Sequence, residues 1–248
     1  MSERIAVWFS CGAVSAVAAK LTLDKYGATH DVRVVNTPIA EEDEDNQRFA
    51  ADVGAWLRVP IERASNPAWP DSSADSVWRA RRYMSGVAGA PCTGELKKRA
   101  RILWENKYTP TYHVLGFTSD EVKRHERFIL TERDNVLPVL IDAGMTKADC
   151  AKYLQREGLR LPRVYELGYP NANCVGCVKA TSPEYWNHVR KVHPQVFAQR
   201  AELSDELGVK LARYKGERIA LSELPENARG RTMKSMNLDC GIFCEEKA

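Results

Sequence analysis

Short apolar runs alternate with longer segments in which apolar residues recur at helical spacing, up to about residue 160. A short apolar run predicts a buried strand, and the helical spacing predicts an amphipathic helix. The predicted strands cover residues 4–9, 31–36, 59–62, 112–117 and 136–141. The predicted helices cover residues 12–26, a segment that begins at 41–45 and passes Trp56, and residues 77–84, 93–107, 119–130 and 146–157. This alternation predicts an α/β fold with a parallel, Rossmann-like sheet and helices on both faces.

The pattern changes after Leu161, where a loop rich in Gly, Pro and Asn leads to a Cys-x-x-Cys pair. The expected elements beyond it are a helix over 183–207, broken at Pro194, and a hairpin over 210–221. A polar tail follows. We therefore expect an α/β domain over residues 1–160 and a helical, cysteine-bearing C-terminal extension over residues 161–248, packed on that domain.

Composition adds little to this picture except through the cysteines. The chain has 248 residues, an apolar fraction of 44% and a net charge of +3, so charge gives no reason to expect non-specific nucleic-acid binding. No apolar run reaches the roughly 18 residues of a membrane span. The first residues lead directly into a strand, which predicts a cytoplasmic protein without a signal peptide. Seven cysteines in that setting favour metal binding or redox chemistry over structural disulfides.

The turn between the first predicted strand and helix has the composition of a phosphate-binding loop. It consists of Ser10, Cys11, Gly12, Ala13, Val14 and Ser15. Backbone N–H groups at a helix start are unpaired, and the helix dipole favours an anion there. The serine hydroxyls add donors, and Gly12 permits close approach of a ligand. A tight turn without a ligand is the alternative.

Two further segments follow predicted strands and are expected at the same edge of the sheet. Asn36 and Thr37 end the second strand, and Gly116, Phe117 and Thr118 follow the fourth, with Arg124 on the next helix. Ligands of open α/β sheets bind at the carboxyl ends of the strands. Thr118 or Ser119 is also a candidate helix N-cap, a role that is compatible with ligand binding.

The cysteines divide into candidate ligands and candidate core residues. Cys174 and Cys177 have a spacing that can bind one metal ion or one iron of a cluster, and a redox dithiol has the same spacing. The other members of the set are Cys92, Cys240 and Cys244. Cys150 lies among alanines on a helix and is expected in the core. Cys11 lies in the phosphate turn, where a lowered pKa would make it a second reactive thiol.

The first loop resembles the PP-loop Ser-Gly-Gly-x-Asp-Ser of the ATP-pyrophosphatase and sulfonucleotide-reductase superfamily, with Cys11 and Val14 as departures. The segment from Gly116 to Arg127 resembles that superfamily's second nucleotide segment, with Thr118 where Arg is common. Through segments such as 137–146, 171–179 and Tyr185-Trp186, the chain is similar over most of its length to phage-associated proteins of the phosphoadenosine phosphosulfate (PAPS) reductase family. The resemblance implies an adenine nucleotide alpha-hydrolase-like fold and an adenine nucleotide ligand such as ATP, AMP or a PAPS-like molecule.

The same resemblance implies roles for the cysteines. Cys92, Cys174, Cys177 and Cys244 would hold a [4Fe–4S] cluster, and Cys240 would be the catalytic nucleophile. The roles of Cys240 and Cys244 can be exchanged, so that Cys240 is the alternative fourth ligand. A zinc ion bound by the same thiols is the rival to the cluster.

Three functions follow as expectations. The first is a sulfonucleotide reductase-like enzyme that uses a thiol electron donor. The second is an ATP-dependent adenylating transferase that delivers sulfur or nitrogen to a small molecule or to nucleic acid. The third is a non-catalytic nucleotide-binding phage factor, which would act in the host cytoplasm. No membrane partner is expected, and a homodimer is left open.

Overall fold

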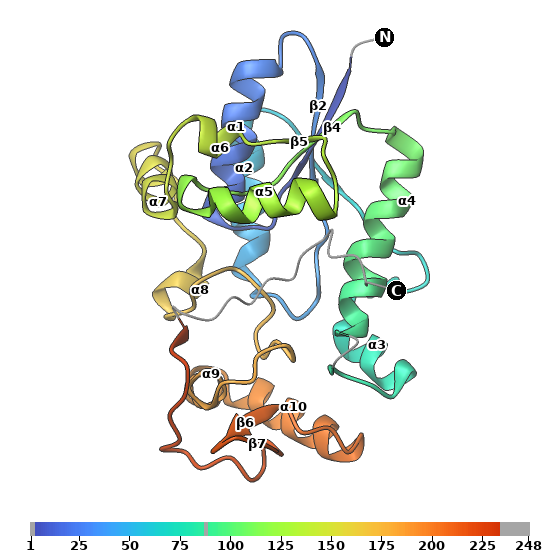
Figure 1. Ribbon diagram of the computed structural model, residues 1–248, viewed down its shortest axis with the longest axis vertical. Coiled ribbons are helices and arrows are strands. Elements are labelled where there is room, and N and C mark those ends of the chain that lie inside the picture. Colours follow the sequence, from blue (N-terminus) through green and yellow to red (C-terminus); the bar gives the residue numbers. More distant parts are fainter. Residues whose placement is uncertain (1–2, 87–88, 234–248) are drawn as a thin grey trace.

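A five-stranded, all-parallel sheet forms the centre of the molecule (Figure 1). The computed structural model describes residues 3–86 and 89–233. The strand order is β3-β2-β1-β4-β5, in which the strands are β1 (Arg4–Trp8), β2 (Asp31–Asn36), β3 (Ile61–Arg63), β4 (Tyr112–Val114) and β5 (Val136–Leu137). Val7 on β1 pairs with Val34 on β2 and with Val114 on β4. The predicted α/β fold with a parallel sheet is confirmed.

Helices connect the strands and continue into the C-terminal region. They are α1 (Ala13–Tyr26), α2 (Asp45–Leu57), α3 (Ala74–Arg81), the π-helix η1 (Thr93–Lys98), α4 (Arg99–Tyr108), the short 3-10 helix η2 (Ser119–Glu121), α5 (Val122–Thr131), α6 (Val139–Asp142), α7 (Lys147–Arg156), α8 (Arg163–Glu166), α9 (Pro183–Val192) and α10 (Pro194–Glu206). The strands β6 (Ala212–Tyr214) and β7 (Glu217–Ile219) form an antiparallel hairpin.

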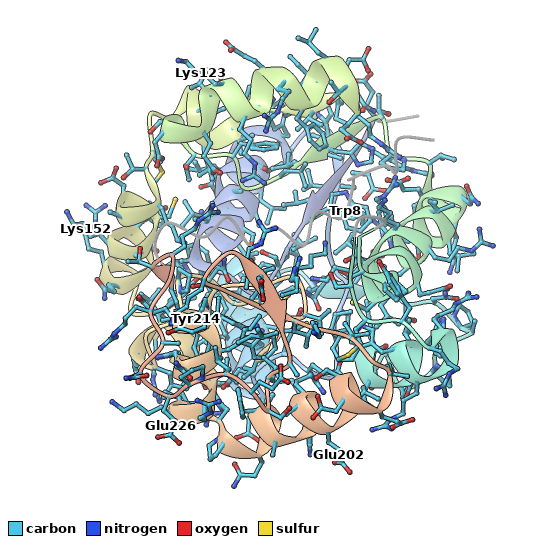
Figure 2. The ribbon with its side chains drawn as sticks, turned by 60° about the horizontal axis from the view of Figure 1, so that its bottom comes forward. Trp8, Lys123, Lys152, Glu202, Tyr214 and Glu226 are labelled. Atoms are coloured by element: carbon cyan, nitrogen blue, oxygen red, sulfur yellow. The ribbon has the colours of Figure 1, made fainter. Side chains whose placement is uncertain are left out.

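Helices cover both faces of the sheet. Successive side chains of a strand point to opposite faces, so each face has apolar residues to bury. Ile5, Val7 and Phe9 pack against apolar residues of α1, α2, α6 and α7. Ala6 and Trp8 point to the other face, where they pack with Trp104 of α4. Figure 2 shows Trp8 inside the molecule, whereas Lys123 and Lys152 lie at its rim. β1 is thus buried on both sides, as its continuous apolar run predicts.

The C-terminal elements gather at one end of the molecule, where α9, α10, β6 and β7 lie together (Figure 1). Their core is shared with earlier parts of the chain. Val77 and Trp78 of α3 and Leu96 of η1 belong to the same apolar cluster as Trp186 and Leu203. The extension therefore packs on residues that precede it by about 100 positions.

Most differences from the predicted elements have a local cause. The predicted strand 136–141 ends at Leu137, because Pro138 has no N–H to donate to the sheet, and Val139 begins the short helix α6. The predicted helix 93–107 begins as the π-helix η1. The expected break at Pro194 is confirmed, since α9 ends at Val192 and α10 begins at Pro194. None of the helices in the part of the chain that the structure describes is long and apolar enough to span a bilayer.

Candidate nucleotide site at the carboxyl edge of the sheet

The first loop has a backbone conformation that turns sharply between β1 and α1. Cys11 has a φ of 55°, in the left-handed region, and Gly12 is extended with φ −106° and ψ 157°. The hydroxyl of Ser15 holds the turn together, because it accepts from the Ser10 amide at 3.1 Å and donates to the Gly12 carbonyl at 3.0 Å. The serines expected to add donors for a ligand thus also bond to each other and to the loop.

The first turn of α1 presents amide groups to the edge of the sheet. The Ala13 N–H donates to the hydroxyl of Tyr165 at 3.2 Å. Among the described residues, no acceptor is bonded to the amides of Val14 and Ser15. Such groups, with the positive end of the helix dipole, favour an anion. The backbone therefore has the character of the predicted phosphate site.

The segment after β4 lies directly against this loop. A Cβ atom on Gly116 would lie 2.9 Å from Cγ1 of Val14, closer than real Cβ contacts, so glycine is required by the approach of the two segments. The structure thus brings together two regions that are about 100 residues apart in the sequence. Their convergence was predicted from the positions of the two strands.

Thr118 and Arg124 have partners of their own in this segment. Thr118 and Glu121 form a capping box, in which the Thr118 hydroxyl lies 3.0 Å from Oε2 of Glu121. Arg124 pairs with Oε1 of the same glutamate at 2.5 Å, and its guanidinium lies over the Phe117 ring. The capping role predicted for Thr118 is confirmed, while contact of either residue with a nucleotide stays a prediction.

Asn36 lies at the end of β2, close to the first loop. Its side-chain amide donates to the Phe9 carbonyl at 2.7 Å and to the Cys11 sulfur at 3.6 Å. Both Asn36 and Thr37 are buried. Asn36 thus stabilises the loop, and contact of these two residues with a nucleotide stays a prediction.

A buried ion pair beside Cys11 is a feature that the sequence did not point to. The ammonium group of Lys97, on η1, lies 3.6 Å from Oε1 of Glu42, and both side chains are only 9% exposed. Burial raises the pKa of Glu42, and Lys97 acts in the opposite direction. In the sequence, Lys97 is a basic residue five positions after Cys92, and Glu42 lies in the segment 41–45 that predicts a helix start. π-Helices occur often at functional sites, but no motif marks one in a sequence.

The structure corrects the expectation of a lowered pKa at Cys11. Burial raises the pKa of this thiol well above its ordinary value, the Glu42 carboxyl acts in the same direction, and only Lys97 lowers it. The side chain is 3% exposed. A buried thiol with a raised pKa is a poor nucleophile, so the reason for treating Cys11 as a second reactive thiol is lost. Cys150 is fully buried, as expected for a core residue.

Three of the predicted ligand thiols pack against one apolar cluster. Cys92, Cys174 and Cys177 are partly buried against the core of the C-terminal region. The Cys177 amide donates to the hydroxyl of the buried Tyr185 at 2.8 Å, and Gly176 has a φ of 68° in the turn between the cysteines. Within residues 3–86 and 89–233, no three His, Cys, Asp or Glu side chains are grouped to hold a metal ion. Cys240 and Cys244 lie outside the described residues.

The chain matches no protein-family model and no curated protein. A functional assignment for this molecule therefore rests on the arrangement of its own residues at the edge of the sheet.

Proposed function

We propose that the protein binds an adenine nucleotide at the carboxyl edge of its sheet, between β1 and β4. The order β3-β2-β1-β4-β5 reverses direction between these two strands, and ligands of open parallel sheets bind at such a switch point. The observation that carries the proposal is the convergence there of the first loop with the Gly116 segment, next to the end of β2. The same convergence supports the assignment of the loop as a PP-loop relative.

The loop composition favours a reductase-like reaction over ATP cleavage. Val14 occupies the place of the acidic residue of the PP-loop, and its side chain contacts Gly116. The nearby Glu42 carboxyl is buried against Lys97. Metal-assisted attack on ATP needs exposed oxygen ligands for Mg²⁺, and the loop itself supplies no carboxylate. The adenylating transferase is therefore the weaker candidate.

The proposed reaction uses the cysteines of the tail and the C-terminal region. The Cys240 thiolate would attack the sulfur of an adenylylated sulfate, forming an S–S bond while the bond from sulfur to the phosphate oxygen breaks. The nucleotide phosphate would leave with its charge stabilised by the first loop. An external thiol donor would then reduce the S–S bond and release sulfite.

The thiols of Cys92, Cys174 and Cys177 suit a [4Fe–4S] cluster in donor type and in their shared apolar surroundings. Cys244 would be the fourth ligand. A bound cluster would supply charge at this place and a covalent link between Cys92 and the turn from Cys174 to Cys177.

Iron and zinc analysis after anaerobic purification tests the cluster assignment. The Cys174→Ser variant is expected to lose the metal, and the Cys150→Ser variant is expected to retain it. Zinc without iron in the purified protein would refute the iron–sulfur cluster. Retention of the metal by Cys174→Ser would refute the assignment of Cys174 as a ligand.

Titration calorimetry with ATP and AMP tests the nucleotide site. Ser15→Ala removes the hydroxyl that holds the loop and should weaken binding by about five- to thirtyfold, since it removes two hydrogen bonds that contribute about 1 kcal/mol each. Ser76→Ala is the control. Ser76 lies on the distant α3, where its hydroxyl donates to Asp71, and this variant should bind both nucleotides as the wild type does. The proposal fails if the wild type binds neither nucleotide.

The reaction itself is tested by product analysis. Sulfite release from an adenylylated sulfate, lost in Cys240→Ser, would support the reductase. Pyrophosphate release from ATP would support the transferase instead, and nucleotide binding without either product would support the non-catalytic alternative.

A further inference from the structure

Tyr165 reaches the first loop from a distant part of the chain. It lies on α8, which Figure 1 places between α7 and α9. Its ring packs against the apolar core beneath the sheet, and its hydroxyl accepts from the Ala13 amide at 3.2 Å across 152 residues of sequence. A Cβ atom on Gly12 would lie 3.2 Å from the same hydroxyl. The Tyr165 oxygen therefore lies beside Gly12 and Ala13, at the start of α1.

The hydroxyl retains a donor in this position. A phenol can accept a hydrogen bond and donate one at the same time. Tyr165 accepts from Ala13, but among the described residues no acceptor is bonded to its own O–H. Burial raises the pKa of Tyr165, although the Ala13 amide acts against this, so the group remains protonated at neutral pH.

The surroundings of this donor favour an anion. The hydroxyl lies at the first turn of α1, beside the unbonded amides of Val14 and Ser15. Donors that converge at a helix start are complementary to phosphate oxygens, and a hydrogen bond to a charged oxygen is stronger than one to a neutral group. A donor that has no acceptor among the described residues thus lies where the phosphate of the proposed ligand would carry its charge.

We propose that Tyr165 is a specificity residue that donates its phenolic hydrogen to a phosphate oxygen of the bound nucleotide while it still accepts from Ala13. The inference rests on the proposed nucleotide site. With this donor, the site should bind ligands that carry a phosphate group more tightly than adenosine, which has none. A Cβ atom on residue 12 would lie only 3.2 Å from the Tyr165 hydroxyl, so glycine at this position leaves room for it.

Titration calorimetry with AMP, inorganic pyrophosphate and adenosine tests this inference on the full chain. Tyr165→Phe keeps the ring and removes only the hydroxyl, so it should weaken binding of AMP and pyrophosphate by about ten- to hundredfold. Binding of adenosine should change less than twofold. Tyr153→Phe is the matched control, since Tyr153 lies on the same domain with its ring against Trp56, and it should bind all three ligands as the wild type does.

The outcomes separate this inference from the site on which it rests. If the wild type binds neither AMP nor pyrophosphate, the site itself is refuted and the role of Tyr165 falls with it. If the wild type binds and Tyr165→Phe binds equally well, or more tightly, the donor role is refuted while the site stands. An equal loss for AMP and adenosine would make Tyr165 a structural residue and would also overturn the inference.

Discussion

His113 illustrates how much the fold changes the chemistry of a single residue. The side chain lies on β4 and is 1% exposed. The indole N–H of Trp8 lies 3.2 Å from its Nδ1, and a guanidinium nitrogen of Arg133 lies 2.8 Å from its Nε2. Burial lowers the pKa of His113 to about 3, with further contributions from Arg133 and Arg101. Nothing in the spacing of the five histidines singles out this one.

The lowered pKa of His113 predicts a loss of stability in mild acid. An unfolded histidine has a pKa near 6.5, so between about pH 6.5 and 3 the unfolded chain binds a proton that the folded chain does not. The contribution of His113 to the free energy of unfolding should therefore fall by about 2 kcal/mol as the pH is lowered from 7 to 5. Urea unfolding at both values should show a smaller fall for His113→Asn, which cannot titrate. Equal falls in the two proteins would contradict the prediction.

The candidate site shows which residue-scale features a sequence can provide. The placement of Gly116 and Asn36 at strand ends follows from the apolar pattern, and the structure confirms that both lie against the first loop. The partners of Asn36 could not be predicted, because a side-chain amide bonds whatever the tertiary structure brings near. Tyr165 has no motif, and only the packing of α8 brings it to Ala13.

At the scale of elements, Glu41 shows how a correct chemical argument can be applied to the wrong helix. The acidic residues 41–45 predict the start of a helix, and α2 begins at the last of them, Asp45. The Glu41 carboxylate instead caps α3, where it accepts from the amides of Ala74 at 2.7 Å and Asp75 at 3.0 Å. Acidic groups favour helix N-termini wherever they lie in the chain, and sequence proximity does not identify the helix.

Glu41 should therefore stabilise α3 and the loop that carries the Glu42–Lys97 pair. Glu41→Ala removes both hydrogen bonds to the helix start and should lower the free energy of unfolding by about 1–2 kcal/mol. Urea unfolding at pH 7 measures the change. Glu44→Ala is the control, since the Glu44 side chain is 82% exposed and pairs with Arg163 at the surface. Similar values for the two variants would contradict the assignment of Glu41 as a cap.

At the scale of the whole molecule, the C-terminal extension completes a core that the α/β part leaves open. Trp186 is fully buried on α9, and its indole N–H donates to the Ala180 carbonyl at 2.9 Å. The same cluster contains Trp78 of α3, over which the guanidinium of Arg200 lies at 4.6 Å. The apolar pattern predicted the elements of each part. It could not predict this shared core, because periodicity shows which residues of an element are buried but not against which other element.

A shared core predicts that the two parts unfold together. Trp186→Ala should lower the free energy of unfolding by about 3–5 kcal/mol, since it leaves a large cavity in a closely packed region. Because residues of α3 and η1 pack in the same cluster as Trp186, hydrogen exchange should accelerate in peptides of α3 and η1 as well as in α9 and α10. Leu130→Ala is the control, since Leu130 is 84% exposed and its loss should leave exchange unchanged. Faster exchange confined to α9 and α10 would instead make the C-terminal extension a separate folding unit, and the site at the sheet edge would then be stable without it.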